Sequence, residues 1–321
     1  MIGMSRKLWI DQIRGLAIVL VVLGHQIPGD ILFNTYTGPI KMPLFFAISG
    51  YLFKANVEFR QFMVNVTKKL VVPWIALGVL VTLPQLYDGV DEFLIKLRNL
   101  FIGEDIWFMP CLIIGEIILY FILHIKNNKL LICSVVICTI VGLMLKQHNV
   151  LDFLMINRAL GVQVFFYLGV LFKNNENKFL QMKWSNILLL AGIYFIVTTY
   201  GLIKYPCEYI DIHLLQFFDY PLNFLAIVIG NIMVFCAFAK LNSGYKILST
   251  IGQHSLVIYI YHGLLIGFVH RVVMSLSVEY CCDIWIIGII RTIYACCICT
   301  ILSIIINKYA PWLVGKTRVE Q

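Results

Sequence analysis

Asp11, Arg14 and His25 are the residues whose types and spacing most directly allow chemistry, and they share the segment IDQIRGLAIVLVVLGH. A helix turns by about 100° per residue, so His25 comes to within about 20° of the face that carries Arg14, and Asp11 lies on the same stripe. The axial distance from Arg14 to His25 is about 16 Å at 1.5 Å per residue. The segment therefore offers a guanidinium that can bind phosphate and an imidazole that can accept a proton.

The surroundings of these three residues are apolar, which restricts where their side chains can lie. Ionisable groups on a lipid-compatible helix are costly to bury, and they normally face a protein interior or a wet cavity. In the alternative interpretation, Asp11 and Arg14 form an interfacial ion pair and His25 is an interfacial cap of the helix.

The whole chain is far more apolar than a soluble domain, with 60% hydrophobic and 13% charged residues. Its apolar segments are long enough to cross a bilayer, and they predict an all-α, polytopic integral membrane bundle of about ten transmembrane helices. We interpret residues 1–321 as a single membrane-embedded domain. The predicted spans are Ile13–His25, Pro39–Phe53, Leu70–Leu86, Trp107–His124, Leu130–Leu145, Ala159–Phe172, Ile187–Ile203, Pro221–Ala239, Ser255–Val273 and Trp285–Ile306.

The charges of the loops predict the orientation of these spans. Lys and Arg are concentrated in alternate loops, as at Lys54 and Lys126, whereas Asp88 and Asp211 belong to loops of the opposite side. The positive-inside rule then places both termini in the cytoplasm. The net charge of +8 fits this topology, and no basic and aromatic stripe indicates nucleic-acid binding. No CxxC pair has a second pair to complete a metal site, so none is predicted.

The longest connection on the outer side, Asp88–Ile106, has apolar residues at helical spacing with charges opposite them. This pattern predicts an amphipathic helix that lies on the outer membrane surface. A lid over a cavity is the alternative.

Other predicted spans also carry ionisable groups, namely Glu116, Arg158, His262 and Arg291, and Lys41 begins the second span. Several such groups of both signs imply a polar interior that runs through the bundle. A purely structural ion pair of Glu116 with Arg158 or Arg291 is the alternative.

Two further features concern how these helices pack. Ser49 and Gly50 form a small pair in the second span that lets a neighbouring helix approach closely, and Pro43 is expected to break that helix. His262 is flanked by Tyr259 and Tyr261, which could hydrogen-bond it as a packing residue.

Four segments of the chain resemble, in this order, motifs of the family 3 membrane acyltransferases. They are IDQIRGLAIVLVVLGH, MPLFFAISGYLF, WFMPCLIIGEIILYF and IGQHSLVIYIYHG. The similarity is to the branch of fucose 4-O-acetylase-like and enterobacterial common antigen acetylase-like proteins, and it covers nearly the whole chain. It implies a bundle of ten or eleven helices in the inner membrane that moves acetyl groups from acetyl-CoA to sugar hydroxyls of surface glycans.

The resemblance also implies roles for particular residues. The basic residue and the histidine of the family's first helix correspond to Arg14 and His25, its acidic position in the fourth helix to Glu116, and its late histidine to His262. The Ser-Gly of the family's second helix corresponds to Ser49 followed by glycine. This branch commonly has a histidine where Lys41 stands, which puts a second-helix histidine role in doubt.

The predicted mechanism combines this resemblance with the geometry of the first helix. Acetyl-CoA would lie with its phosphorylated end near Arg14 and its thioester near His25, a separation comparable with an extended pantetheine arm. His25 would act as the general base on a sugar hydroxyl. The other residues expected to act in catalysis are Asp11 and Glu116, and those expected to hold acetyl-CoA are Arg14, Ser49, Lys41, Arg158 and His262.

Two alternatives remain open at this point. One is a covalent acetyl-histidine intermediate in place of direct transfer. The other is a transporter or flippase for a small polar molecule or a lipid-linked sugar, which intramembrane charges would also suit. The acceptor is expected to be a cell-surface or lipid-linked polysaccharide sugar, and its identity cannot be read from the sequence.

Overall fold

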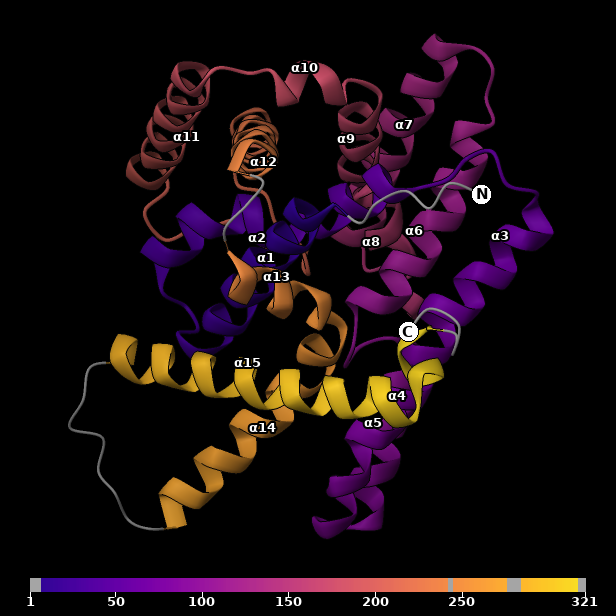
Figure 1. Cartoon of the computed structure of the whole chain (residues 1–321), viewed down its shortest axis with the longest axis vertical. Coiled ribbons are helices and arrows are strands. Elements are labelled where there is room, and N and C mark those ends of the chain that lie inside the picture. Colours follow the sequence, from indigo (N-terminus) through magenta and orange to yellow (C-terminus); the bar gives the residue numbers. More distant parts are fainter. Residues whose placement is uncertain (1–6, 242–244, 276–283, 317–321) are drawn as a thin grey trace.

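The computed structural model describes residues 7–241, 245–275 and 284–316, with the backbone alone for 269–275. These residues are almost entirely helical (Figure 1). Within the described ranges, β-structure is limited to an isolated bridge between Asp211 and Gln216. The prediction of an all-α fold is confirmed.

The helices follow one another with short connections. Four short 3-10 or π-helical turns join or extend them, at Thr67–Val71, Leu83–Tyr87, Phe153–Met155 and Pro311–Val314. In chain order the α-helices are α1 Leu8–Gln26, α2 Ile31–Leu52, α3 Phe59–Val66, α4 Val72–Thr82, α5 Val90–Ile102, α6 Phe108–Leu123, α7 Asn128–Gln147, α8 Ile156–Gly161, α9 Gln163–Asn174, α10 Glu176–Leu180, α11 Trp184–Lys204, α12 Tyr220–Leu241, α13 Lys246–Gln253, α14 Ser255–Ser275 and α15 Ile284–Tyr309.

Six helical stretches in the described part of the chain are long and apolar enough to cross a membrane. The number rises to eight if each of two bent helix pairs forms one span. The fourth predicted span, Trp107–His124, corresponds to α6, which is apolar but has only 16 residues. Several membrane-spanning helices are therefore confirmed, whereas the count of ten stays a prediction. The six stretches are Leu8–Gln26, Phe59–Tyr87, Asn128–Gln147, Trp184–Lys204, Tyr220–Leu241 and Ile284–Tyr309.

Helix α2 begins earlier than the apolar pattern indicated. Its predicted range was Pro39–Phe53, but the helix starts eight residues before that, at Ile31 (31 + 8 = 39). Asp30 caps it, because its carboxylate accepts a hydrogen bond of 2.7 Å from a backbone N–H of the first turn. The first turns are polar, so hydropathy alone missed them. Lys41 therefore lies inside the helix rather than at its start, and Pro43, contrary to expectation, lies within a continuous helix.

The sixth predicted span, Ala159–Phe172, is bent rather than straight. It is divided between α8 and α9, which meet at 54°. The buried side chain of Gln163 donates to the carbonyl oxygens of Ala159 and Gly115, at 2.8 and 3.1 Å. These bonds satisfy carbonyl groups near the bend, as a helix break inside an apolar bundle requires.

A sharper bend of 80° separates α13 from α14 at His254. His254 leaves the helical conformation, and its Nδ1 lies 2.8 Å from the Ser303 hydroxyl of α15. Because of this bend, α14 begins at Ser255, where the sequence placed the start of the ninth span.

Helices α2 and α9 approach one another closely at two glycines. A Cβ on Gly50 would lie 1.9 Å from the carbonyl oxygen of Phe166, and one on Gly169 would lie 1.8 Å from that of Ala47. No side chain fits at such distances, so the two backbones meet directly. The predicted role of Gly50 in close helix approach is confirmed.

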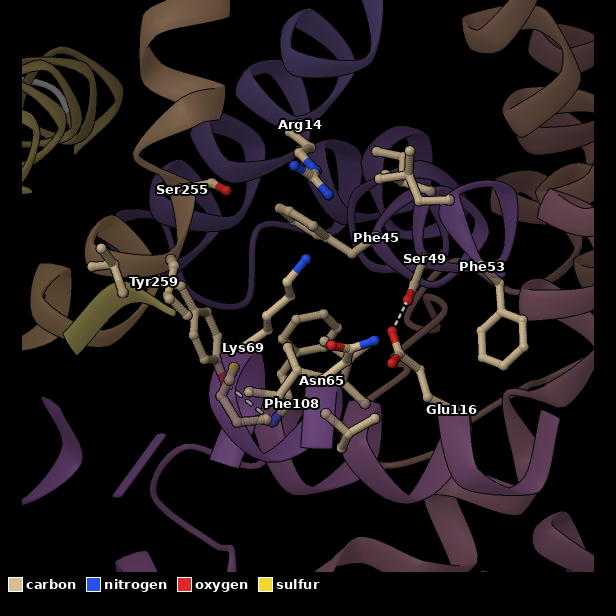
Figure 2. Close-up of a pocket in the computed structure, with 18 of the residues that line it drawn as sticks. Arg14, Phe45, Ser49, Phe53, Asn65, Lys69, Phe108, Glu116, Ser255 and Tyr259 are labelled. Atoms are coloured by element: carbon tan, nitrogen blue, oxygen red, sulfur yellow. Dashed lines mark hydrogen bonds between the residues drawn. The ribbon is translucent and has the colours of Figure 1, made fainter. Parts of the chain in front are cut away.

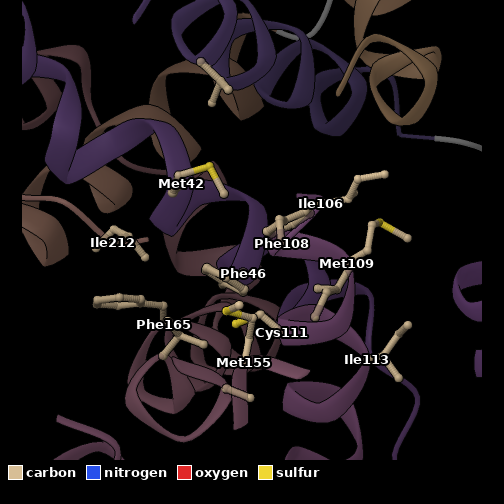
Figure 3. Close-up of a cluster of buried hydrophobic side chains, with 14 of the residues drawn as sticks. Met42, Phe46, Ile106, Phe108, Met109, Cys111, Ile113, Met155, Phe165 and Ile212 are labelled. Atoms are coloured by element: carbon tan, nitrogen blue, oxygen red, sulfur yellow. The ribbon is translucent and has the colours of Figure 1, made fainter. Parts of the chain in front are cut away.

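Helix α1 is central to the bundle (Figure 1). It contacts α2, α12, α13, α14 and α15. Its crossing with α13 is also set by glycine, since a Cβ on Gly252 would lie 1.7 Å from the carbonyl oxygen of Asp11. On another side, buried aromatic and aliphatic side chains of α2, α6 and α9 pack together, among them Phe46, Met109 and Phe165 (Figure 3). This core fixes α1, α2 and α6 as rigid supports for their polar residues.

The connection Asp88–Ile106 contains helix α5, as predicted. Leu100, on its apolar face, is buried against Gly78 of α4. The position of α5 on the outer membrane surface stays a prediction.

Candidate active site

A cavity of about 490 Å³ lies beside the first half of α1 and is called here the Arg14 cavity. Its walls come from α1, α2, α3, α6, α13, α14 and the segment after α15. Much of the lining is apolar, but several charged and polar side chains also line the cavity. The polar side chains of the lining are Arg14, Ser49, Lys54, Asn65, Lys69, Glu116, Gln253, Ser255, Tyr259 and Lys316.

Arg14 and Lys69 enter this cavity from opposite sides (Figure 2). Lys69 belongs to the π-helical turn Thr67–Val71 between α3 and α4. A π turn inserts a residue into the helical repeat and so changes which side chains face inward, and such turns are frequent at functional sites. Lys69 was not predicted as a site residue, because a lysine next to a predicted span usually indicates only which side of the membrane its loop occupies.

Asp11 supports Arg14 rather than lining the cavity. Its carboxylate is buried, lies 4.0 Å from the Arg14 guanidinium, and accepts a hydrogen bond of 3.4 Å from Gln253 on α13. Asp11 is therefore placed to orient Arg14.

Glu116 and Ser49 form a polar pair on another wall of the cavity (Figure 2). The Ser49 hydroxyl donates a hydrogen bond to the Glu116 carboxylate. Arg14 and Lys69 are the positive charges that act on this carboxylate. Glu116 thus interacts electrostatically with two of the cations that line the cavity, and its hydrogen-bond partner is Ser49 rather than a buried arginine. Arg14, Ser49 and Glu116, which the sequence singled out on three different spans, line the same cavity.

A second polar region lies at the other end of α1. We call it the His25 cluster, and it consists of His25, Lys41, Asp211, His213 and His262. The rings of His25 and His262 are 5.1 Å apart, centroid to centroid. The other three residues are the charged and titratable groups that interact electrostatically with His25. His25 itself is exposed.

His262 is held in one orientation by backbone carbonyl groups. Its Nδ1 lies 3.0 Å from the oxygen of Ile258 and 2.8 Å from that of Tyr259. A carbonyl oxygen only accepts, so Nδ1 must carry the proton, and in the neutral ring Nε2 is then an unprotonated acceptor. The tyrosine hydroxyls suggested by the sequence do not hold this ring.

Lys41 and Arg158 lie at this end of the molecule and do not line the Arg14 cavity. Lys41 donates to the Asn34 side chain at 2.8 Å. Arg158 is buried, is paired with Asp152, and donates from Nε to the His213 carbonyl oxygen at 2.6 Å. Arg158 thus holds the backbone at His213 in place.

The connection between α11 and α12 supplies residues that the sequence analysis did not propose for the site. Asp211 accepts hydrogen bonds from the backbone N–H groups of His213 and Leu214, at 2.8 and 3.2 Å. The His213 ring packs on Trp107, with centroids 4.9 Å apart. Burial lowers the pKa of His213, and the charge of Arg158 lowers it further. The available signal was an Asp and a His two residues apart in a loop, which is weak.

Aromatic side chains separate the two regions. Phe45, Phe108 and Tyr259 line the Arg14 cavity, and the Phe108 ring lies 5.6 Å from Phe45 and 5.4 Å from Tyr259. The Tyr259 ring is also 6.4 Å from that of His262. Tyr259 therefore stands between the cavity and the histidine pair.

Ser255, Tyr259 and His262 lie on one stripe of α14, because they are four and three residues apart. They face the α1 residues Arg14 and His25, which the sequence placed on one stripe of its helix. The active-site candidate is thus a seam between two helices, with a basic end at Arg14 and a histidine end at His25 and His262.

Residues 7–308 match the sequence model of the acyltransferase 3 family, described as an acyltransferase domain. A segment is 36% identical over 73 residues to the inner membrane protein YcfT of Escherichia coli K12, and the match covers 17% of this chain and 20% of that protein. The chain thus matches about a fifth of the length of this relative. No solved structure matches the chain significantly.

Proposed function

The chain belongs to the acyltransferase 3 family, and from this premise we propose that it is a multi-pass membrane O-acetyltransferase that uses acetyl-CoA. The acceptor in this proposal is a hydroxyl of a cell-surface or lipid-linked polysaccharide sugar. The observation that carries the proposal is the seam between α1 and α14, which joins a basic cavity at Arg14 to a histidine pair at His25 and His262.

The Arg14 cavity has the properties expected of a site for the donor. Arg14, Lys69, Lys54 and Lys316 supply positive charge for the phosphate groups. A guanidinium binds phosphate with two hydrogen bonds and a lysine binds it as a point charge. The volume of about 490 Å³ lies within the range of small-molecule sites, about 300–1,000 Å³. The apolar walls suit the arm that carries the thioester.

The same charges support an orientation for the protein. Lys54, Lys69 and Lys316 line the cavity, whereas Asp152 and Asp211 lie near the His25 cluster. We therefore place the Arg14 end at the cytoplasm, where acetyl-CoA is made, and both termini on that side. The ten-span topology in the inner membrane belongs to this proposal.

The reaction is proposed to occur at the histidine pair. An unprotonated imidazole nitrogen of His25 takes the proton of the sugar hydroxyl as the hydroxyl oxygen bonds to the acetyl carbonyl carbon. The carbon–sulfur bond then breaks, and the proton goes to the departing thiolate. A general base of this kind contributes about 10²–10⁴ in rate. Because His25 is exposed, an acceptor can reach it from the surface.

His262 and Lys41 are proposed to support His25. The fixed tautomer of His262 presents Nε2 as an acceptor, which can orient a protonated nitrogen of His25. A positive charge on Lys41 disfavours an accumulated imidazolium on His25, so the proton moves on to the leaving group. Asp11 orients Arg14, and Glu116 with Ser49 binds polar groups of the donor arm.

Three measurements distinguish an acetyltransferase from a transporter or flippase. Mass spectrometry of surface glycan should show acetylated sugar in a strain that expresses the protein and none in its deletion strain. Purified protein in liposomes should release free CoA from acetyl-CoA only when an acceptor sugar is present. Flux of the sugar across the liposome membrane without acetyl-CoA would instead identify a transporter or flippase.

A further inference from the structure

Tyr259 carries a hydroxyl that does not hydrogen-bond His262, contrary to the sequence-based expectation, and that has no part in the reaction proposed above. This side chain is half-buried, lines the Arg14 cavity and lies next to His262. It thus occupies the place where an acyl group that enters from the cavity first approaches the histidine pair. A polar group at that place is positioned to touch the reacting carbonyl.

The hydrogen bonding of Tyr259 leaves its proton available. The backbone N–H of Phe108, at the start of α6, donates to the Tyr259 hydroxyl oxygen over 3.1 Å. Within the described part of the chain, this is the bond that the hydroxyl makes, and it makes it as acceptor. A phenol can accept and donate at once, so the O–H remains free to donate. A hydroxyl that accepts a hydrogen bond is polarised and becomes a stronger donor.

We propose that the Tyr259 hydroxyl donates a hydrogen bond to the carbonyl oxygen of the donor's acetyl group and stabilises the oxyanion of the transition state. This inference rests on the proposed function and adds a catalytic residue to it. When the sugar oxygen bonds to the carbonyl carbon, the electron pair of the C=O bond moves to oxygen and faces the Tyr259 O–H. When the C=O bond re-forms, the carbon–sulfur bond breaks and the thiolate leaves.

Helix α14 carries both the Tyr259 hydroxyl and His262. The backbone carbonyl of Tyr259 accepts the Nδ1 proton of His262, while its side chain faces the cavity. One residue thus fixes the tautomer of His262 and presents the oxyanion donor. Preorganised donors of this type are often the largest single contribution to acyl transfer.

The test compares Tyr259→Phe with Tyr261→Phe in the full chain in nanodiscs. Tyr261 lies on the same helix and is half-buried, but its hydroxyl is directed at the Leu77 carbonyl oxygen, 3.5 Å away, and does not line the cavity. Tyr259→Phe should lower kcat about 10²–10³-fold, as for loss of one oxyanion donor, with KM for acetyl-CoA unchanged. Tyr261→Phe should resemble the wild type.

A spectroscopic readout separates this role from a structural one. With carbonyl-¹³C acetyl-CoA bound, the infrared carbonyl stretch should lie at lower frequency in the wild type than in Tyr259→Phe. Replacement of Tyr259 by 3-fluorotyrosine, which keeps the hydroxyl and makes it more acidic, should lower the frequency further and retain activity. This third variant keeps the test valid if Tyr259→Phe fails to fold.

The outcomes distinguish the two proposals. An active wild type with an equally active Tyr259→Phe, or with an unchanged carbonyl frequency, would overturn the role of Tyr259 and leave the acetyltransferase standing. A wild type that binds acetyl-CoA but never releases CoA in the presence of acceptor would overturn both.

Discussion

The two ends of α1 satisfy their polar groups in different ways. At the Arg14 end, charged and polar side chains from several helices surround a cavity. At the His25 end, the polar groups hold one another and the backbone, as His262 does with two carbonyl oxygens and Arg158 with the His213 carbonyl. The first arrangement leaves room for a charged ligand, whereas the second fixes side-chain orientation. Under the proposed function, this difference would separate affinity for the acyl donor from the chemistry of transfer.

The sharpest way to break this comparison is to remove the imidazole of His25. His25→Ala should lower the rate of CoA release in the presence of acceptor by about 10²–10⁴-fold, because the general base is lost. Binding of acetyl-CoA should remain, since His25 does not line the Arg14 cavity. His148→Ala, which alters an exposed histidine outside both regions, is the control. Normal turnover by His25→Ala would remove His25 from the mechanism.

Removal of the Arg14 guanidinium, at the opposite end of α1, should weaken binding of acetyl-CoA rather than slow the transfer step. Arg14→Ala should weaken acetyl-CoA binding about 10- to 100-fold, because charge-assisted hydrogen bonds contribute about 1.5–3 kcal/mol. Calorimetric titration of the purified protein measures this, and the loss should be smaller at high salt. Arg60→Ala, an exposed arginine of α3 outside the cavity, should bind acetyl-CoA normally. Equal affinities for Arg14→Ala and Arg60→Ala would contradict the assignment of the cavity.

Helix α2 contributes to both regions, so its packing should affect them together. Gly169→Ala places a Cβ 1.8 Å from the Ala47 carbonyl oxygen and should destabilise the fold by about 1–3 kcal/mol. Gly263→Ala meets nothing within 4 Å and should unfold like the wild type. Thermal unfolding in detergent compares the two. Equal melting temperatures would show that α2 and α9 are not in direct backbone contact.

The smallest expected effect is a pH dependence at the His25 end. Because burial and Arg158 lower the pKa of His213 below its usual 6.5, the unfolded chain binds more protons once the pH falls below that value. Stability should therefore be complete at neutral pH and decline as the pH falls through about 6.5 toward the lower folded-state pKa. His213 is faced by Arg158, Asp211, Lys146 and Asp152.

The measurement is the melting temperature between pH 5 and 8. It should fall by a few degrees on the acid side, and His213→Asn should reduce that slope. A variant with the full wild-type slope would assign the pH dependence to another group.

The sequence predicted the helical class and singled out some of the polar residues that line the Arg14 cavity. Hydropathy located α1, α7, α11 and α12 within a few residues, since long apolar runs have one structural solution in a membrane. Residues with charge in an apolar context, such as Arg14 and Glu116, had to face a polar interior. Both line the cavity.

The rest depended on tertiary contacts that no single segment encodes. Because the first turns of α2 are polar, hydropathy did not locate the start of this helix. The bends between α8 and α9 and between α13 and α14 interrupt apolar segments that look continuous in the sequence. Lys69 enters the cavity through a π turn, and Asp211 reaches His25 from a loop almost two hundred residues away in sequence (211 − 25 = 186). Hydrophobic periodicity carries no information on such pairings.

The connection between α11 and α12 meets the His25 cluster, but none of its residues lines the Arg14 cavity. Its exposed residues can therefore change without altering the walls of the Arg14 cavity. Under the proposed function, this connection would contact the acceptor and not the donor. In the proposed enzyme, exchange of the exposed residues of the 205–219 segment should alter the choice of sugar, while the affinity for acetyl-CoA stays that of the parent.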